Sequence, residues 1–196
     1  MFKDQEPSIF EWSQKFYLHN WKGKFYSFLE TTSTNDLAKE SFPETVPLLF
    51  LAKRQTKGRG QYGRTWQNPI NENGALLITY SYPVKKPVPP QFSLEMSQIL
   101  REAIQRIWNI SHLTVKSPND LYLNTSKVAG FLCEMISQGD RHQLIIGLGL
   151  NVFSAPKNVP VAGYLLSIND VTEDDWYLFL KTWDHLREEL IIKYSS

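Results

Sequence analysis

Short apolar runs and alternating apolar and polar positions dominate this chain, and they predict strands. Such segments cover residues 25–29, 48–52, 76–82, 113–116, 121–123, 128–135 and 144–152. Polar turns of hairpin length join the strands of the second half of the chain. The pattern therefore predicts a sheet in which many neighbouring strands follow one another along the sequence.

Helical periodicity appears in separate segments between these strands. Hydroxyl and amide groups at residues 33–35 can cap a helix that runs through Lys39. Another helix is predicted by the apolar face Leu94, Ile99, Leu100, Ala103, Ile104 and Ile107. Thr172 and Asp175 form a capping-box-like start for a last helix with the face Trp176, Phe179, Leu180, Trp183, Leu186 and Leu190. We expect an α+β fold with a central mixed sheet flanked by helices.

Composition agrees with one compact domain. The 196 residues are 42% hydrophobic and 21% charged, which is typical of globular proteins. Residues 1–24 mix aromatic and charged positions without a clean period, so we expect an ordered but irregular lead-in, with a short helix as one option. The net charge is only +1, so any anionic ligand must be held by a local cluster of cations.

The single cysteine, Cys133, allows no internal disulfide and no multi-cysteine zinc site. The chain opens without the apolar stretch of a signal peptide, and its longest apolar runs, 48–52 and 75–82, are far shorter than the ~20 residues that cross a bilayer. We therefore expect a soluble cytoplasmic protein with no membrane partner. Cys133 lies in an alternating strand, where a small buried thiol is more common than a nucleophile.

The most unusual stretch is a basic, glycine-rich loop over residues 53–66. No Asp or Glu occurs between residues 45 and 71, whereas the loop carries Lys53, Arg54, Lys57, Arg59 and Arg64 among Gly58, Gly60 and Gly63. Glycines let backbone N–H groups approach a ligand, and arginine binds phosphate or carboxylate in pairs. A phosphate-binding loop is one interpretation; a mobile solvated loop or a patch for RNA backbone is the alternative.

A second candidate site combines the turn at residues 116–120 with Lys127 and Gly130. Pro118-Asn119-Asp120 is first of all turn chemistry. Across the predicted hairpin, however, Lys127 could pair with a phosphate while Asp120 holds Mg²⁺, and Gly130 would let a ligand lie against the strand. The Gly147-x-Gly149 pair is too short for a dinucleotide fingerprint and carries little weight alone.

Taken together, these segments resemble biotin protein ligases in order and spacing. The resemblance rests on Thr32–Asn35, Gln55–Trp66, Lys116–Gly130 and Gly147–Val152, and it spans about residues 25–152. It implies the biotin–lipoyl ligase catalytic fold, which is similar to class II aminoacyl-tRNA synthetases. It also implies an enzyme that uses ATP and Mg²⁺ to form biotinyl-5′-AMP. The biotin then passes to a lysine of a biotin carboxyl carrier protein, a subunit of acetyl-CoA carboxylase.

The resemblance also implies roles for individual residues. The groups expected to act on the reacting atoms are Lys127, Arg59 and Arg64. The expected biotin-binding residues are Ser33, Thr34, Asn35, Gln55, Gly58, Arg59, Gly60, Gln61, Lys127 and Gly130. The expected ATP- and adenylate-binding residues are Arg59, Arg64, Trp66, Asn119, Asp120, Lys127 and Asn151, with Asp120 as a magnesium ligand. For residues 33–35, simple helix capping is the alternative.

Several departures from the family pattern qualify this interpretation. Gln61 and Tyr62 stand where many members carry arginines, and Ser117 replaces the tryptophan of the usual Lys-Trp-Pro-Asn-Asp motif. The lead-in 1–24 is too short for the winged helix-turn-helix of repressor-type members, so we expect no DNA binding. Residues 25–196 would form the catalytic domain without the SH3-like barrel that many bacterial members carry, in a monomer or weak homodimer.

Other functions remain open on sequence alone. A lipoyl or octanoyl ligase or transferase shares the fold and an equivalent lysine. A non-catalytic protein that binds biotin or a carrier domain is a further alternative, as is an RNA-binding module that stacks bases on Tyr62 and Trp66.

Overall fold

The computed structural model describes residues 7–195, which form a seven-stranded sheet in the order β1-β2-β3-β7-β6-β5-β4. The strands are β1 (Lys24–Thr31), β2 (Leu48–Gln55), β3 (Ala75–Val84), β4 (Leu113–Lys116), β5 (Asp120–Leu123), β6 (Ser126–Gln138) and β7 (Arg141–Asn151). Strands β1 and β2 run parallel, and every other neighbouring pair is antiparallel. The predicted mixed sheet is confirmed, and the predicted strands lie within these seven or overlap them.

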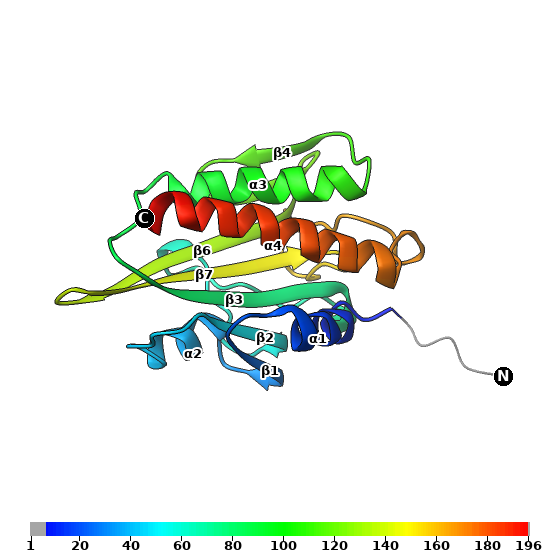
Figure 1. The fold of residues 1–196 in the computed structure, drawn as a ribbon. Coiled ribbons are helices and arrows are strands. Elements are labelled where there is room, and N and C mark those ends of the chain that lie inside the picture. The colour runs from blue at the N-terminus through cyan, green and yellow to red at the C-terminus, as the bar shows by residue number, and fades with distance from the viewer. Residues whose placement is uncertain (1–6, 196) are drawn as a thin grey trace.

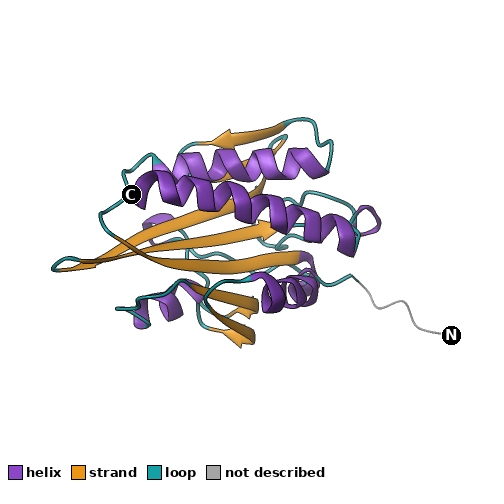
Figure 2. Ribbon diagram, viewed as in Figure 1, coloured by secondary structure: helices purple, strands orange, loops and turns teal. Residues whose placement is uncertain are grey.

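Helices cover both faces of this sheet (Figures 1 and 2). They are α1 (Ile9–Asn20), α2 (Thr34–Glu40), α3 (Phe92–Ile107) and α4 (Glu173–Ser195). The larger core joins α1, α3 and α4 to one face of the sheet through alternate strand residues such as Leu49 and Leu51. On the opposite face, α2 packs on Leu48, Phe50 and Ile145. Alternation along the strands thus divides the sheet between two cores.

The N-terminal segment corrects the sequence-based expectation. Instead of an irregular lead-in, residues 9–20 form a regular helix whose N-terminus is capped by Ser8, which accepts a hydrogen bond from Glu11 N at 3.3 Å. Residues Ile9, Phe10, Phe16 and Tyr17 are buried against the larger core. A buried serine on this face, Ser13, and an exposed leucine on the other side, Leu18, obscure the helical period in the sequence. Residues 1–6 of the predicted lead-in lie outside the described residues.

The last helix begins as predicted. The Thr172 hydroxyl donates to Asp175 Oδ2 at 2.7 Å, and Asp175 N donates back to Thr172 Oγ1 at 3.2 Å. The helix buries the predicted apolar face. Across the described residues, no helix combines the length and apolarity needed to cross a membrane.

Candidate active site

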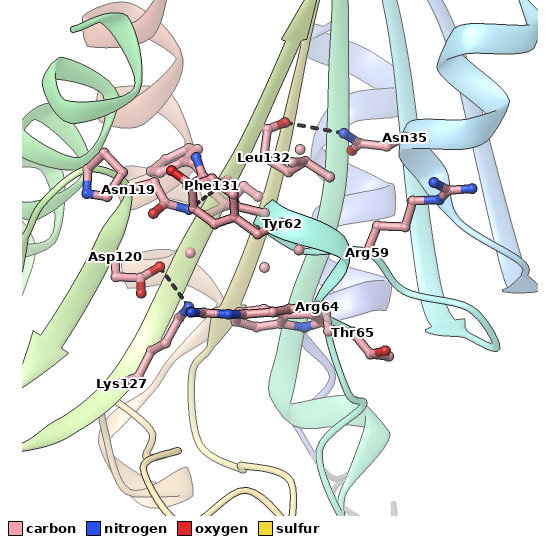
Figure 3. Close-up of a pocket in the computed structure, with 18 of the residues that line it drawn as sticks. Asn35, Arg59, Tyr62, Arg64, Thr65, Asn119, Asp120, Lys127, Phe131 and Leu132 are labelled. Atoms are coloured by element: carbon pink, nitrogen blue, oxygen red, sulfur yellow. Dashed lines mark hydrogen bonds and ion pairs between the residues drawn. The ribbon is translucent and has the colours of Figure 1, made fainter. Parts of the chain in front are cut away.

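A cavity of about 530 Å³ opens where α2, the loop after β2 and the β4–β5 turn meet strands β6 and β7 (Figure 3). Most of the lining comes from segments that sequence analysis singled out, because those segments leave or join strands at this region. All of the predicted site residues line the cavity except Gly58 and Asn151. Gly58 instead packs against Trp66, whose backbone N–H donates a hydrogen bond to Gly58 O at 2.9 Å. Asn151 donates to Gly163 O at 2.9 Å, beside the cavity.

Lys127 and Asp120 face each other across the β5–β6 hairpin, as the sequence predicted. Lys127 Nζ lies 2.6 Å from Asp120 Oδ1 and forms an ion pair with it. The distance is short enough for a hydrogen bond, but the angles between the two groups are not those of one. Gly130 stands opposite Asp120 in the strand register, and a Cβ at Gly130 would come within 3.2 Å of both charged atoms. The absent side chain therefore leaves the space that the ion pair occupies.

Two hydrogen bonds between Asn119 and Phe131 connect the β4–β5 turn to β6. Asn119 Nδ2 donates to Phe131 O at 2.5 Å, and Phe131 N donates to Asn119 O at 2.9 Å. Asn119 is buried, so its amide fixes the turn rather than reaching solvent. These bonds fix the position of Asp120 beside Lys127.

Trp66 lines the cavity and lies directly on β7. A Cβ at Gly149 would collide with the indole ring, and a Cβ at Gly147 would collide with Asn35 Oδ1. The Gly147-x-Gly149 pair, weak as a motif, thus lets two side chains rest against the strand. The Trp66 ring lies 5.7 Å from Lys127 Nζ, and its buried Nε1–H has no hydrogen-bond partner among the described residues.

The basic loop folds back on itself beside the cavity. Gly60 N donates to Arg64 O at 2.8 Å, and the turn between them uses left-handed backbone at Tyr62 (φ 57°) and Gly63 (φ 72°). Arg59 Nε lies 2.9 Å from Asp36 Oδ2 on α2. Figure 3 shows Arg59 on the opposite side of the cavity from Asp120 and Lys127. Arg59 and Arg64 both line the cavity, and Arg59 is in addition bound to α2.

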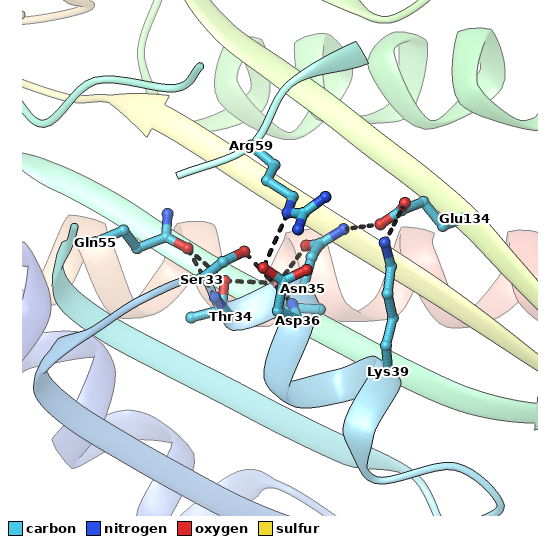
Figure 4. A network of polar contacts seen from close by, with 9 residues as sticks. Ser33, Thr34, Asn35, Asp36, Lys39, Gln55, Arg59 and Glu134 are labelled. Atoms are coloured by element: carbon cyan, nitrogen blue, oxygen red, sulfur yellow. Dashed lines mark hydrogen bonds and ion pairs between the residues drawn. The ribbon is translucent and has the colours of Figure 1, made fainter. Parts of the chain in front are cut away.

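The other end of the cavity is a polar network around the start of α2 (Figure 4). Gln55 Oε1 accepts from Thr34 N at 2.7 Å and from the Thr34 hydroxyl at 3.1 Å. Ser33 Oγ accepts from Asp36 N at 3.4 Å, which is the capping contact that the alternative interpretation predicts. Ser33, Thr34 and Asn35 are all buried and all line the cavity. Capping and ligand binding are therefore compatible at this position.

The donor set limits how a metal ion could be held. Among the described residues, no group of three or more His, Cys, Asp or Glu side chains could enclose a metal ion. Asp120 supplies one carboxylate to the cavity, and Lys127 already contacts it. Mg²⁺ in nucleotide sites commonly keeps waters and phosphate oxygens and takes only one or two protein carboxylates. The residues fit a magnesium ion that arrives with a nucleotide, with Asp120 as one ligand.

Cys133 is unsuited to nucleophilic catalysis. Although the residue is only half-buried, burial of its thiol raises the pKa of Cys133 to about 12. Thiolate is therefore scarce at neutral pH. The prediction that Cys133 is a small packed thiol agrees with this environment.

Sequence reasoning missed two parts of the site. Thr79 and Glu134 join the polar network around Asn35, and Val159 and Val161 line the cavity from the segment after β7. A signal existed for Glu134, because strand alternation puts it on the same face as Gly130. The segment 155–166 has no periodicity that could have predicted its position.

Comparisons with known proteins agree with this geometry. Residues 25–151 match the family described as "Biotin/lipoate A/B protein ligase family". The chain is 32% identical over 142 residues to the "Bifunctional ligase/repressor BirA" of Bacillus subtilis, covering 69% of this chain and 42% of that protein. It is 28% identical over 159 residues to the human "Biotin--protein ligase", covering 75% of this chain and 22% of that protein. The chain thus spans less than half the length of these relatives.

Solved structures extend the likeness to three dimensions. Biotin protein ligase from Aquifex aeolicus, solved in complex with biotin and ATP, has a TM-score of 0.62 and 27% identity, covering 87% of this chain and 71% of that chain. Biotin protein ligase from Leishmania major, in complex with biotinyl-5-AMP, has a TM-score of 0.61 and 26% identity, covering 87% and 79%. The expected catalytic fold is therefore confirmed.

Proposed function

The chain belongs to the biotin/lipoate A/B protein ligase family, and from that premise we propose that it is a biotin protein ligase. It joins biotin to ATP as biotinyl-5′-AMP and then transfers biotin to a lysine of a biotin carboxyl carrier protein. Residues 25–196 act as the catalytic domain. The proposal draws on relatives that are named as biotin--protein ligases in Arabidopsis thaliana and in humans.

The observation that carries the proposal is the Lys127–Asp120 pair in the cleared space over Gly130. In the first step, a biotin carboxylate oxygen bonds to the α-phosphorus of ATP, and the bond from that phosphorus to the pyrophosphate oxygen breaks. Negative charge then develops on oxygens around phosphorus. The Lys127 ammonium and the Arg64 guanidinium are the fixed cations that stabilise this charge at the cavity wall. A bound Mg²⁺ would neutralise phosphate charge, with Asp120 as its protein ligand.

The remaining residues orient the two substrates. Thr34, Ser33 and Gln55 bind the ureido ring of biotin, whose N–H and C=O groups match their hydroxyl and amide chemistry. Trp66 flanks the adenylate beside Lys127. Asn119 fixes the β4–β5 turn, and Asn151 supports the neighbouring wall from outside the cavity.

In the second step, the neutral amine of the carrier lysine attacks the carbonyl carbon of the mixed anhydride. The new bond is an amide, AMP leaves with the electrons of the broken C–O bond, and the amine nitrogen releases one proton to solvent. Water would destroy the anhydride, so the glycine-rich loop must shield it. The loop has the turn at Tyr62 and Gly63 about which such a movement can occur.

The test is ATP–pyrophosphate exchange with biotin, lipoate and octanoate supplied separately. The expected result is exchange that requires biotin and falls about a hundredfold or more in Lys127→Ala, because the removal of one fixed transition-state donor typically has that effect. Lys181→Ala, which removes an exposed lysine of α4, is the matched control. Exchange with lipoate alone would assign the chain to lipoyl ligation. Biotin binding without exchange would identify a non-catalytic biotin-binding protein.

A further inference from the structure

The Asn35 side chain is held in the cavity wall by three hydrogen bonds, which use both hydrogens of its NH₂ group. Asn35 Nδ2 donates to Leu132 O at 3.2 Å and to Glu134 Oε2 at 2.9 Å. Asn35 Oδ1 accepts from the Thr79 hydroxyl at 2.7 Å. The residue is only 5% exposed, and Gly147 lies directly against Oδ1. Asn35 therefore acts within the wall of the cavity.

The orientation of this amide is fixed by its partners. A backbone carbonyl and a carboxylate only accept hydrogen bonds, so they both require the NH₂ group of Asn35. Asn35 Oδ1 must then face Thr79, which donates to it. The bond to Glu134 is charge-assisted and stronger than a neutral one. Lys39 Nζ lies 2.5 Å from Glu134 Oε1 and balances the carboxylate charge (Figure 4).

The fixed orientation of the Thr79 hydroxyl in turn determines the orientation of the Thr34 hydroxyl. The Thr79 oxygen lies 2.8 Å from Thr34 Oγ1, and both hydroxyls are buried. The single hydroxyl hydrogen of Thr79 is taken by Asn35 Oδ1, so Thr79 can only accept from Thr34. The one hydroxyl hydrogen of Thr34 is therefore shared between Thr79 Oγ1 and Gln55 Oε1, which lies 3.1 Å away. Thr34 can therefore offer the cavity only an oxygen lone pair. A ligand group that meets Thr34 must be a hydrogen-bond donor.

We propose that Glu134, neutralised by Lys39, is the positioning residue of the ring-binding end of the cavity. It acts through Asn35 and Thr79 to hold Thr34 as an acceptor for a ligand N–H group. This inference rests on the proposed function, because the N–H donor is that of the biotin ureido ring. The same contacts would select biotin over lipoate and octanoate, because the dithiolane ring of lipoate and the alkyl chain of octanoate have no N–H group. An acid without that donor leaves the Thr34 oxygen desolvated and unpaired.

The first measurement is the equilibrium binding of biotin without ATP, by titration calorimetry. Glu134→Gln and Thr79→Val are expected to weaken biotin binding about tenfold, the typical cost of a misplaced or unpaired buried polar group. Thr79→Ser keeps the hydroxyl and should restore binding to within about threefold of the wild type. Glu102→Gln, which removes an exposed surface carboxylate paired with Arg106, is the matched control.

The second measurement separates positioning from a general structural defect. In the exchange assay, Glu134→Gln and Thr79→Val should raise the KM for biotin about tenfold, while kcat and the KM for ATP stay within about twofold. The wild type should also bind biotin about ten- to a hundredfold more tightly than a urea-N-methylated biotin. That ratio should shrink in Thr79→Val.

The outcomes distinguish this inference from the proposed function. If the wild type binds no biotin, the proposed function is wrong and this inference falls with it. If the wild type binds biotin but folded Glu134→Gln binds it within twofold of the wild type, only the positioning role is refuted. Equal losses in kcat and in the KM for ATP would also refute it. Should Thr79→Val fail to fold, Glu134→Gln alone decides, because it removes a charge at a half-buried site with little change in volume.

Discussion

The fully buried guanidinium of Arg187 provides a sharp test of how the far face of the sheet is held together. Arg187 is 0% exposed and forms an ion pair with Asp184 one turn earlier on α4. Its Nε donates to Tyr82 Oη at 3.1 Å, and its guanidinium lies 3.8 Å above the Tyr80 ring. Burial opposes the charge, but Asp184 and the surrounding tyrosines raise the pKa of Arg187 above its ordinary value. The residue is therefore a charged group inside the core.

The perturbation is Arg187→Met, which keeps length and helix propensity but removes the charge. Removing one partner of a buried ion pair typically costs about 3–5 kcal/mol, and we expect the lower end because the Asp184 side chain is 17% exposed. For a chain of this size, about 3 kcal/mol corresponds to a fall in Tm of about 6–12 °C. Tyr17, which donates to Asp184 Oδ1 at 3.0 Å, would remain as the partner of the stranded carboxylate.

The assay is urea unfolding of the wild type, Arg187→Met, Asp184→Asn and the double variant. Because the two charges compensate each other, Arg187→Met should cost at least about 1 kcal/mol less in the Asp184→Asn background than in the wild type. Additive effects, or a loss below about 1 kcal/mol in Arg187→Met alone, would refute the reasoning. The cavity lies on the α2 side of the sheet, so the KM for biotin per folded molecule should not change.

Further predictions follow from single features of the site. Gly149→Ala places a methyl group in the Trp66 ring, so tryptophan fluorescence should shift and the KM for ATP should rise about tenfold. Because the pKa of Cys133 is raised to about 12, its reaction with a disulfide reagent at pH 8 should be at least about a hundredfold slower in the native than in the unfolded chain. That native rate should then climb about tenfold per pH unit, since the thiol deprotonates only at higher pH. Asp120→Asn should raise the Mg²⁺ concentration needed for half-maximal exchange, whereas an unchanged requirement would exclude Asp120 as a ligand.

The parts of the fold that sequence predicted are those specified by local periodicity. The hairpins from β4 to β7 alternate with period two and are joined by short turns, so their pairing follows from adjacent residues. Helix α1 was not predicted because polar Ser13 lies on its buried face and apolar Leu18 on its exposed one. The burial of Arg187 was not predicted for a different reason, since a charged residue on a helix normally faces solvent.

In the candidate site, too, contacts within one hairpin could be predicted from sequence and contacts between distant elements could not. Lys127, Asp120 and Gly130 lie on one hairpin, so their meeting could be predicted from sequence. The polar network could not, because Asn35, Thr79 and Glu134 belong to separate elements. Their contact depends on the order of strands in the sheet, which places β3 beside β7 and β7 beside β6. The role of Gly147 also appears only after Asn35 is placed against it.

Strand β6 connects the two ends of the cavity and separates their tasks. Gly130 lies beside the Asp120–Lys127 pair, and Glu134 lies in the network that orders Thr34. The backbones of Gly130 and Glu134 are about 13 Å apart, because a strand rises about 3.3 Å per residue. A ligand whose ring is held beside Thr34 must therefore extend along β6 to bring its carboxylate to Lys127. Changes at Glu134 should consequently affect ring binding, and changes at Lys127 the reaction, because a rigid strand holds the two groups at a fixed separation.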